Sequence, residues 1–223
     1  MTASTLLPVT ASSRKKLKAA VERYEMQISL ELDDWLAGRG LEDGAVSGAR
    51  LGEVDDPFPE HEAYKGWLVI PYLDKDGEPL TMRFRRPDWY GSEDRAKYKS
   101  LPHDPARLYN IRAIHNATGA EMHVTEGELD ALILEQVGYP AVAIPGANNF
   151  KPHHARMLAG FSEIYLWPDG DKAGAELAAT MSKYLRDSLI VLTLPNGEDV
   201  NSLYLKGGKA ALESTVKEWG NGD

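Results

Sequence analysis

Carboxylate side chains occur at three points where a predicted strand ends and a helix is about to begin. Glu126 lies in the sequence Thr-Glu-Gly-Glu, Asp169 and Asp171 lie in Pro-Asp-Gly-Asp, and Asp199 lies in Gly-Glu-Asp-Val-Asn. Oxygen ligands without cysteine favour a hard cation such as Mg²⁺ or Mn²⁺, and the chain contains no cysteine. We therefore expect these four acids to hold divalent cations, with no zinc.

The same acids have a structural alternative, because Asp and Glu are favoured at the N-termini of helices. For any one of them, helix capping is as good an explanation as metal binding. Capping explains less well the combination of an Asp-x-Asp followed by Lys172-Ala-Gly, an earlier Glu-Gly-Glu and a later Asp-x-Asn ending at Asn201. We expect Glu128 and Glu198 to be bystanders.

The elements that must position these acids alternate between short apolar runs and amphipathic stretches. We predict strands at 121–124, 141–144, 163–167 and 189–194, and helices at 129–137, 153–159, 172–186 and 200–219, the last with a Gly207-Gly208 break. Strands alternating with helices of this length indicate an α/β fold with a parallel sheet. Ligands bind such sheets at the carboxyl ends of the strands, where the acids lie.

The first half of the chain shows a different pattern, typical of a small α+β unit. A flexible tail (1–13) precedes a helix at 14–36, capped by Ser12 or Ser13, and a loop-rich connection at 42–66. Apolar runs at 66–72 and 80–85 flank a turn and predict a hairpin, and the segment 87–116 is polar and irregular. We place a domain boundary between residues 117 and 118.

The charge distribution is uneven. The chain of 223 residues has a net charge of −9, yet the window from Thr81 to Arg112 holds eight Lys or Arg against four Asp or Glu. Such a segment can contact nucleic-acid phosphates, although a solvated strand face is the alternative. The candidate nucleotide- or DNA-binding residues are Arg83, Arg85, Arg86, Lys97, Lys99, Lys172 and Asn201.

The bulk composition, with 43% hydrophobic residues and 26% charged residues, is typical of a globular protein. The first thirteen residues lack the features of a signal peptide, and no apolar run approaches the roughly 18 residues of a membrane span. These features, with the absence of cysteine, favour a cytoplasmic protein without a membrane partner.

The acidic motifs resemble those of the Toprim domain, which primases, topoisomerases and some nucleases share. The block from His123 to Ala131 is similar to the first motif of that family, residues 167–174 to its Asp-x-Asp motif, and residues 199–201 to the third acidic element of primases. The loop at Gly146 also has a counterpart. The resemblance covers roughly residues 120 to 220 and implies a Toprim-type, Rossmann-like domain.

The preceding segment resembles the basic subdomain of DnaG-type primases. Residues 35–41 are similar to their early Tyr-Leu-x-x-Arg-Gly-Leu element, 70–77 to their hairpin, 97–102 to a Lys-Tyr-Leu-Asn-Ser-Pro motif and 108–110 to a Leu-Tyr-Asn motif. The strand at 82–86 departs from the family, which has glycines there. Either Arg85 or Arg86 is therefore expected to take the role of the family's arginine.

This resemblance implies a DNA-directed RNA polymerase of the primase type. Such a nucleotidyltransferase makes short RNA primers on a single-stranded DNA template from ribonucleoside triphosphates, with two metal ions held by the acids. The chain has neither zinc-ligating cysteines nor a Walker A motif. Either it is an excised core, or the zinc module and the helicase of the family lie on separate polypeptides, which are then its expected partners. The alternatives are a Toprim-type nuclease, which hydrolyses phosphodiesters, and a non-catalytic replication or recombination scaffold.

Overall fold

The computed structural model describes residues 10–90, 96–102, 104–146, 149–195 and 197–220, in two compact units. The first unit comprises residues 1–34 and 47–105, and the second comprises 35–46 and 106–223. Relative to the sequence-based boundary, residues 35–46 and 106–117 belong with the second unit. Residues 1–9 of the predicted tail, Arg95 and residues 147–148 of the Gly146 loop lie outside the described residues.

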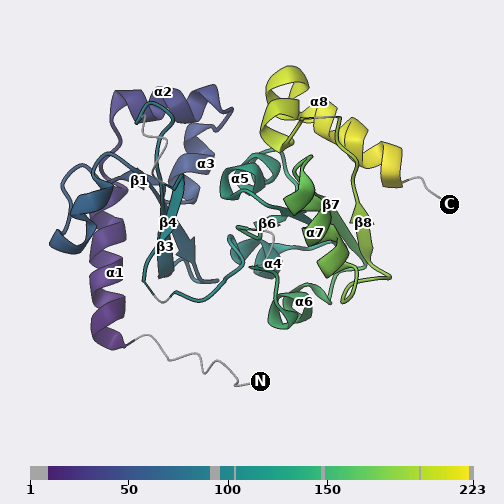
Figure 1. Ribbon diagram of the computed structural model, residues 1–223, viewed down its shortest axis with the longest axis horizontal. Coiled ribbons are helices and arrows are strands. Elements are labelled where there is room, and N and C mark those ends of the chain that lie inside the picture. The colour runs from purple at the N-terminus through teal and green to yellow at the C-terminus, as the bar shows by residue number, and fades with distance from the viewer. Residues whose placement is uncertain (1–9, 91–95, 103, 147–148, 196, 221–223) are drawn as a thin grey trace. The chain divides into compact units, whose positions relative to one another are not determined.

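The first unit contains an antiparallel sheet whose strands follow one another in chain order (Figure 1). Its strands are β1 (Gly52–Glu53), β2 (Leu68–Leu73), β3 (Pro79–Arg85) and β4 (Tyr98–Ser100). Its helical elements are α1 (Ala11–Tyr24) and η1 (Pro59–Tyr64), while α2 (Leu30–Gly38) and α3 (Asp43–Gly48) each contain a division point between the units. A core of residues such as Tyr24, Trp67 and Phe84 packs α1 against the sheet.

The predicted single helix over 14–36 is wrong, because two helices occupy that stretch. The chain turns after α1, where the N–H of Gln27 donates to the carbonyl of Tyr24 at 3.0 Å. Ser29 then begins α2: its hydroxyl accepts from the N–H of Leu32, and its own N–H donates to the Glu53 carboxylate at 2.8 Å. At the other end, Thr10 caps α1 in place of the predicted serines, so the helix takes in residues 11–13 of the predicted tail.

The predicted hairpin is confirmed as β2 and β3, which pair antiparallel from Leu68 opposite Arg85 to Leu73 opposite Pro79. An Asp74 carboxylate oxygen closes the turn by accepting from the N–H groups of Asp76 and Glu78, at 2.9 and 3.0 Å. Strand β4 was not predicted, because it lies in the stretch expected to be irregular.

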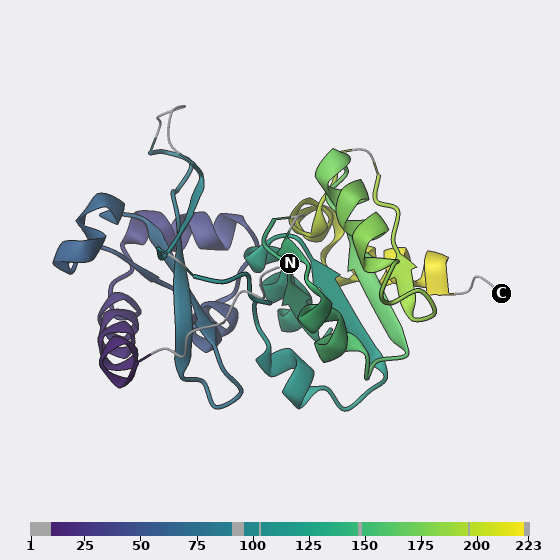
Figure 2. The same ribbon diagram turned by 60° about the horizontal axis from the view of Figure 1, so that its bottom comes forward.

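The second unit is an α/β layer structure, which confirms the predicted fold class. Four parallel strands in the order β6-β5-β7-β8 form its sheet, and helices cover both faces (Figures 1 and 2). In chain order the elements are α4 (Arg112–Asn116), β5 (Glu121–Thr125), α5 (Glu128–Gln136), β6 (Ala141–Ala143), α6 (Pro152–Leu158), β7 (Glu163–Trp167), α7 (Lys172–Met181), β8 (Leu189–Val191) and α8 (Val200–Gly220). The predicted glycine break in α8 is present as a kink at Gly208, whose φ is +58°.

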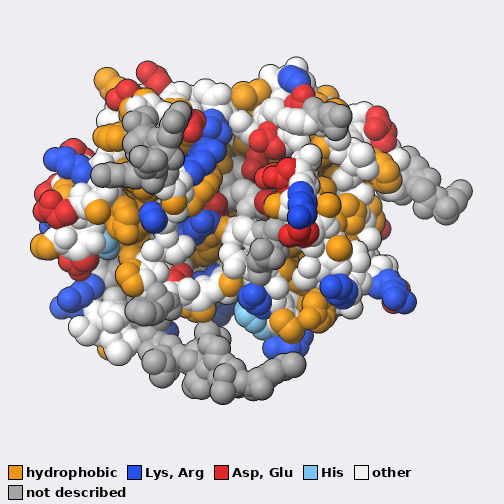
Figure 3. Space-filling view, viewed as in Figure 1, with side chains coloured by type: hydrophobic (Ala, Val, Ile, Leu, Met, Phe, Trp, Pro, Cys, Tyr) orange, Lys and Arg blue, Asp and Glu red, His pale blue; other side chains and the backbone are white. Residues whose placement is uncertain are grey.

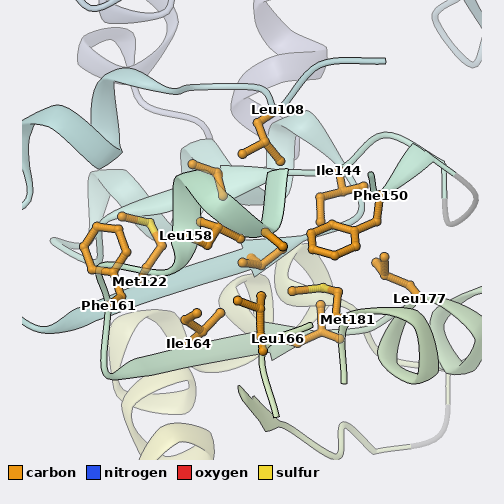
Figure 4. Packing of buried hydrophobic residues seen from close by; sticks show 14 of the residues in the cluster. Leu108, Met122, Ile144, Phe150, Leu158, Phe161, Ile164, Leu166, Leu177 and Met181 are labelled. Atoms are coloured by element: carbon orange, nitrogen blue, oxygen red, sulfur yellow. The ribbon is translucent and has the colours of Figure 1, made fainter. Parts of the chain in front are cut away.

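Strand alternation assigns the residues of β5 and β7 to two faces of this sheet. Met122 and Val124 point to one face, where they meet apolar side chains of α6 and α7 in the main core (Figure 4). His123 is fully buried on the opposite face, where its Nδ1 accepts a hydrogen bond of 2.9 Å from the indole N–H of Trp167. The two strands that carry the acidic motifs are thereby joined by side chains as well as by backbone.

Within the described residues, no helix has both the length and the apolar character required to span a membrane.

Candidate functional site

Glu126 is the first residue after β5, at the carboxyl edge of the parallel sheet. The hydroxyl of Thr125 donates to the carbonyl of Gly127 at 2.9 Å and holds the turn between β5 and α5. Gly127 caps α5 without a side-chain hydrogen bond, so the Glu126 carboxylate is not used for helix capping. The sheet edge therefore presents this acid with its carboxylate available for other contacts.

Asp169 comes two residues after the neighbouring strand β7 and is brought next to Glu126. Its backbone N–H donates to Glu126 Oε1 at 3.0 Å. The first turn of α7 packs closely here: a Cβ atom on Gly174 would lie 2.2 Å from the carbonyl oxygen of Asp169 and 2.8 Å from Glu126 Oε1. Glycine at position 174 allows the helix to approach both acids.

Asp171 and Asp199 have the capping role that the sequence left as the alternative. Asp171 is the N-cap of α7, and its Oδ1 accepts from the N–H of Gly174 at 3.0 Å. Asp199 stands at the beginning of α8, where its Oδ1 accepts from the N–H of Ser202 at 2.7 Å. Capping uses one oxygen of each carboxylate, so these contacts and metal binding are compatible.

The electrostatics single out Glu126 among the four acids. Its pKa is raised to about 7, chiefly by burial and also by the negative charges of Asp169 and Asp171, while the hydrogen bond from Asp169 N–H acts to lower it. Asp199 is not among the groups responsible for this shift. Figure 3 shows Asp and Glu side chains gathered beside α5 in this unit. Glu126, Asp169 and Asp171 are thus close enough to interact electrostatically, while Asp199 caps its own helix.

Every candidate ligand is a carboxylate oxygen, which is the kind of ligand that a hard divalent cation prefers. In the described part of the chain, however, no three His, Cys, Asp or Glu side chains converge as a ready-made metal site. The side chains of Asp169 and Asp171 would have to turn toward Glu126 to share an ion. The raised pKa of Glu126 is the observation that favours such an ion, because a cation would remove the cost of ionising that carboxyl.

The other predicted site residues of this unit differ in their exposure and in their contacts. The Lys172 side chain is 91% exposed and lies 3.6 Å from Glu176. The side-chain amide of Asn201 donates to the carbonyl of Arg39, so it anchors the start of α8. Glu198 forms an ion pair with Lys206, which lowers its pKa, and Glu128 is buried.

Asp130 is a residue that the sequence reasoning missed. Its Oδ1 accepts from the backbone N–H of Asn201 at 3.2 Å and so connects the first acidic motif to the third. A Cβ atom on Gly127 would lie 2.3 Å from Asp130 Oδ2, which explains the glycine there. The available signal was its position in the first turn of α5, directly after the first acidic motif.

The basic residues belong to the first unit, and pairing of β3 with β4 divides them between the two faces of the sheet. Arg83 lies opposite Ser100 and Arg85 opposite Tyr98, and both guanidinium groups approach the Tyr98 ring, at 4.8 and 5.5 Å from its centroid. Lys99 pairs with Phe84 and therefore belongs to the other face.

The same basic residues differ in how far their side chains are exposed. Arg85, a favoured candidate for phosphate binding, is only 2% exposed, whereas Lys97 and Lys99 are exposed and Arg86 is partly so. The backbone N–H of Arg86 donates to the Lys97 carbonyl at 2.9 Å, which extends the pairing beyond β4. Lys and Arg side chains gather beside β3 and β4 in Figure 3. Of the two arginines left open by the sequence, Arg86 is the more accessible.

A cavity of about 350 Å³ lies at the opposite edge of the parallel sheet, near the beginning of β5. Its lining includes Glu121, Glu135 and Tyr139 and none of the predicted site residues. The carboxylate site is therefore an open sheet edge and not this cavity.

Comparisons with known proteins find similarity to a family model, to curated proteins and to solved structures. Residues 123–204 match the family model described as Toprim-like. The chain is 38% identical over 153 residues to the gene 57 protein of Mycobacterium phage D29, a match that covers 67% of this chain and 97% of that protein. It is 27% identical over 179 residues to the DNA primase of Escherichia coli K12, covering 74% of this chain but 30% of that primase.

A solved structure shares the fold across both units. It is a DnaG primase catalytic domain bound to single-stranded DNA, which matches with a TM-score of 0.76 and 22% identity over 92% of this chain and 78% of that domain. At 22% identity, this similarity shows the fold alone. The match to the bacterial primase spans less than a third of that protein, whereas the phage protein is matched over almost its whole length.

Proposed function

The chain belongs to the family of the gene 57 protein of phage D29 and contains a Toprim-like region at residues 123–204, and from that premise we propose that it is a primase catalytic core. Its reaction would be template-directed nucleotidyl transfer, which joins ribonucleoside triphosphates into short RNA primers on single-stranded DNA. The observation that carries the proposal is the contact between Glu126 and Asp169 at adjacent strand ends, with the Glu126 pKa raised to about 7.

Glu126 and Asp169 are the proposed principal metal ligands, with Asp171 and Asp199 contributing the carboxylate oxygen that helix capping leaves over. Two Mg²⁺ or Mn²⁺ ions would supply positive charge that offsets the triphosphate and lowers the pKa of the attacking 3′-hydroxyl. The chain's own contribution is to hold the acids at one edge of a rigid sheet. Asp130 and Asn201 support that edge by tying α5 to the beginning of α8.

The basic residues of the first unit are the proposed phosphate contacts. Lys97 and Lys99 are exposed ammonium groups, and Arg86 is partly exposed, so all three can reach phosphate oxygens of a template or nucleotide. The buried Arg85 and the neighbouring Arg83 instead lie near the Tyr98 ring. Their proposed role is to position this strand pair, with the phosphates bound by the more accessible cations.

The partners that we propose are single-stranded DNA, ribonucleoside triphosphates, and a zinc module or replicative helicase on a separate polypeptide. The zinc module would select the template, since this chain has no cysteine to ligate zinc. Alone, the chain should therefore prime with little sequence preference.

The test is a primer-synthesis assay with a single-stranded template, labelled ribonucleoside triphosphates and either Mg²⁺ or Mn²⁺. Alkali-labile oligomers support the proposal, template degradation indicates a nuclease, and neither product indicates a scaffold. Asp169→Ala should abolish synthesis while circular dichroism shows an intact fold. Asp187→Ala is the matched control, because Asp187 is an exposed acid of the same unit outside the carboxylate site. Full synthesis by Asp169→Ala would overturn the metal assignment.

A further inference from the structure

Two large aromatic side chains are exposed side by side in the connection between β3 and β4. Trp89 is 37% exposed and Tyr90 is 42% exposed, and their ring centroids lie 6.3 Å apart with the planes tilted by 38°. Aromatic side chains of this size dominate the burial of apolar surface in cores and interfaces. An adjacent pair with this much exposed ring surface can therefore contact a ligand.

The backbone holds this pair in a defined place. The N–H of Tyr90 donates to the carbonyl of Pro87 at 3.1 Å, which forms a turn. The Tyr90 hydroxyl rests against Gly66, where a Cβ atom would lie only 1.8 Å from it. Gly66 is itself fixed, with a φ of +77° and its N–H donating to the carbonyl of Val54 at 2.7 Å. The tyrosine ring thus sits on a glycine that leaves room for it.

Basic residues precede and follow the aromatic pair along the chain. The hydrogen bond from Arg86 N–H to the Lys97 carbonyl closes the base of the connection and puts a basic residue at each end of it. Lys65 is exposed beside Gly66, on which Tyr90 rests. Asp88 is the one acid among the described residues of the connection. Proteins that bind single strands combine aromatic rings, on which the bases stack, with cations that bind the phosphates.

We infer that Trp89 and Tyr90 form a stacking platform for the bases of the single-stranded template, with Arg86 and Lys97 on the adjacent phosphates. The inference rests on the proposed function and adds to it the residues that contact the bases. A single strand fits better than a duplex, because only unpaired bases expose their ring faces. Stacking is tolerant of sequence, so such a platform would hold the template without selecting a particular sequence.

Fluorescence anisotropy with a labelled oligothymidylate, and with an abasic strand that has the same number of phosphates, tests the inference directly. The wild type should bind the oligothymidylate more tightly than the abasic strand. Trp89→Ala and Tyr90→Ala should each weaken binding of the oligothymidylate by about 10-fold and leave the abasic strand unchanged. Trp89→Phe should keep most of the affinity, because it keeps a ring.

Trp219→Ala is the matched control, since Trp219 is 43% exposed but lies on α8 of the other unit. Thermal unfolding establishes that each variant is folded. Equal affinity of wild type, Trp89→Ala and Tyr90→Ala for the oligothymidylate would overturn the inference and leave the pair to a protein partner. A wild type that does not distinguish the two strands would overturn it as well.

The primer-synthesis assay separates this inference from the proposed function. Normal priming by the wild type and normal DNA binding by Trp89→Ala would refute the stacking platform alone. Absence of priming, together with base-dependent binding that is lost in Trp89→Ala, would refute the primase activity and support the platform.

Discussion

Glu126 Oε1 accepts a 3.0 Å hydrogen bond from the backbone N–H of Asp169, which connects two motifs 43 residues apart in the sequence. The contact places a partly buried carboxylate next to a second acid, and the Glu126 pKa rises to about 7 in consequence of burial and charge repulsion. Ionisation of the Glu126 carboxyl group is therefore unfavourable unless a cation or a proton neutralises the charge.

Because ionised Glu126 is unfavourable in the folded state, we predict that Glu126→Gln stabilises the metal-free protein at pH 8. The ordinary pKa of 4.5 lies below the folded value of about 7, so between these values the folded state holds the proton more firmly, and stability falls as pH rises. Glu126→Gln has no carboxyl group at this position, so it does not lose this stability as pH rises. After allowance for solvent screening, its advantage should be about 1 to 2 kcal/mol at pH 8 and nearly absent at pH 4.

Urea unfolding at the two pH values, in the presence of a chelator, measures this difference. Glu218→Gln, at an exposed position on α8, is the control and should show no such dependence on pH. A variant no more stable than wild type at pH 8 would contradict the assignment of Glu126.

Gly174→Ala should damage the site although alanine normally favours a helix. The added Cβ would lie 2.2 Å from the Asp169 carbonyl oxygen and 2.8 Å from Glu126 Oε1, so α7 must shift. We expect a loss of about 1 to 3 kcal/mol of unfolding free energy and a large loss of primer synthesis. Gly160→Ala is the control, because a Cβ there meets no atom within 4 Å. Equal stability and synthesis in both variants would contradict the close packing at α7.

Substitution of Asp171 can separate helix capping from metal binding. Asp171→Asn keeps an oxygen that can accept from Gly174 N–H but removes the charge, whereas Asp171→Ala removes both. We expect Asp171→Ala to cost about 1 kcal/mol of stability and Asp171→Asn much less, while both lose synthesis. Thermal unfolding and the primer assay on the same samples supply the two readouts. If Asp171→Asn retains full synthesis, this residue is a cap only.

His123 should make the fold sensitive to acid. Burial lowers its pKa to about 3 from the ordinary 6.5, so the unfolded chain takes up the proton first and stability is lost as pH falls from 6.5 toward 3. His123→Leu should be less stable than wild type at pH 7 by about 1 to 3 kcal/mol, because Trp167 N–H loses its acceptor.

The stability difference between His123→Leu and wild type should shrink at pH 5. Denaturant unfolding at both pH values measures it, and the other histidines cancel in the comparison because both proteins contain them. A difference that stays constant with pH would show that His123 is not the group responsible.

The sequence was sufficient for the second unit because its signals are local. Strands β5 and β7 each end just before an acid, and a parallel sheet brings such ends to one edge, so Glu126 and Asp169 could be predicted as neighbours. The break between α1 and α2 could not, since Ser29 begins α2 with help from Glu53, a residue 24 positions away. Strand β4 has three residues, and pairing with β3 alone defines it.

The capping roles of Asp171 and Asp199 show a second limit of prediction from sequence. A helix cap and a metal ligand use the same residue types at the same position, so spacing alone does not distinguish them. The structure shows the caps, and the contribution of these two acids to metal binding stays a prediction.

The register of β3 against β4 has a consequence for how relatives of this protein can diverge. Within the paired residues, inserting or deleting one amino acid in β4 would move Lys99 from the face that it shares with Phe84 to the face of Arg83 and Arg85. The described residues of the connection between β3 and β4, 87–90 and 96, take no part in this pairing. Evolutionary change in this unit should therefore collect in that connection, so that related proteins could acquire, lengthen or lose an aromatic contact to the template while their strand pairing stays the same.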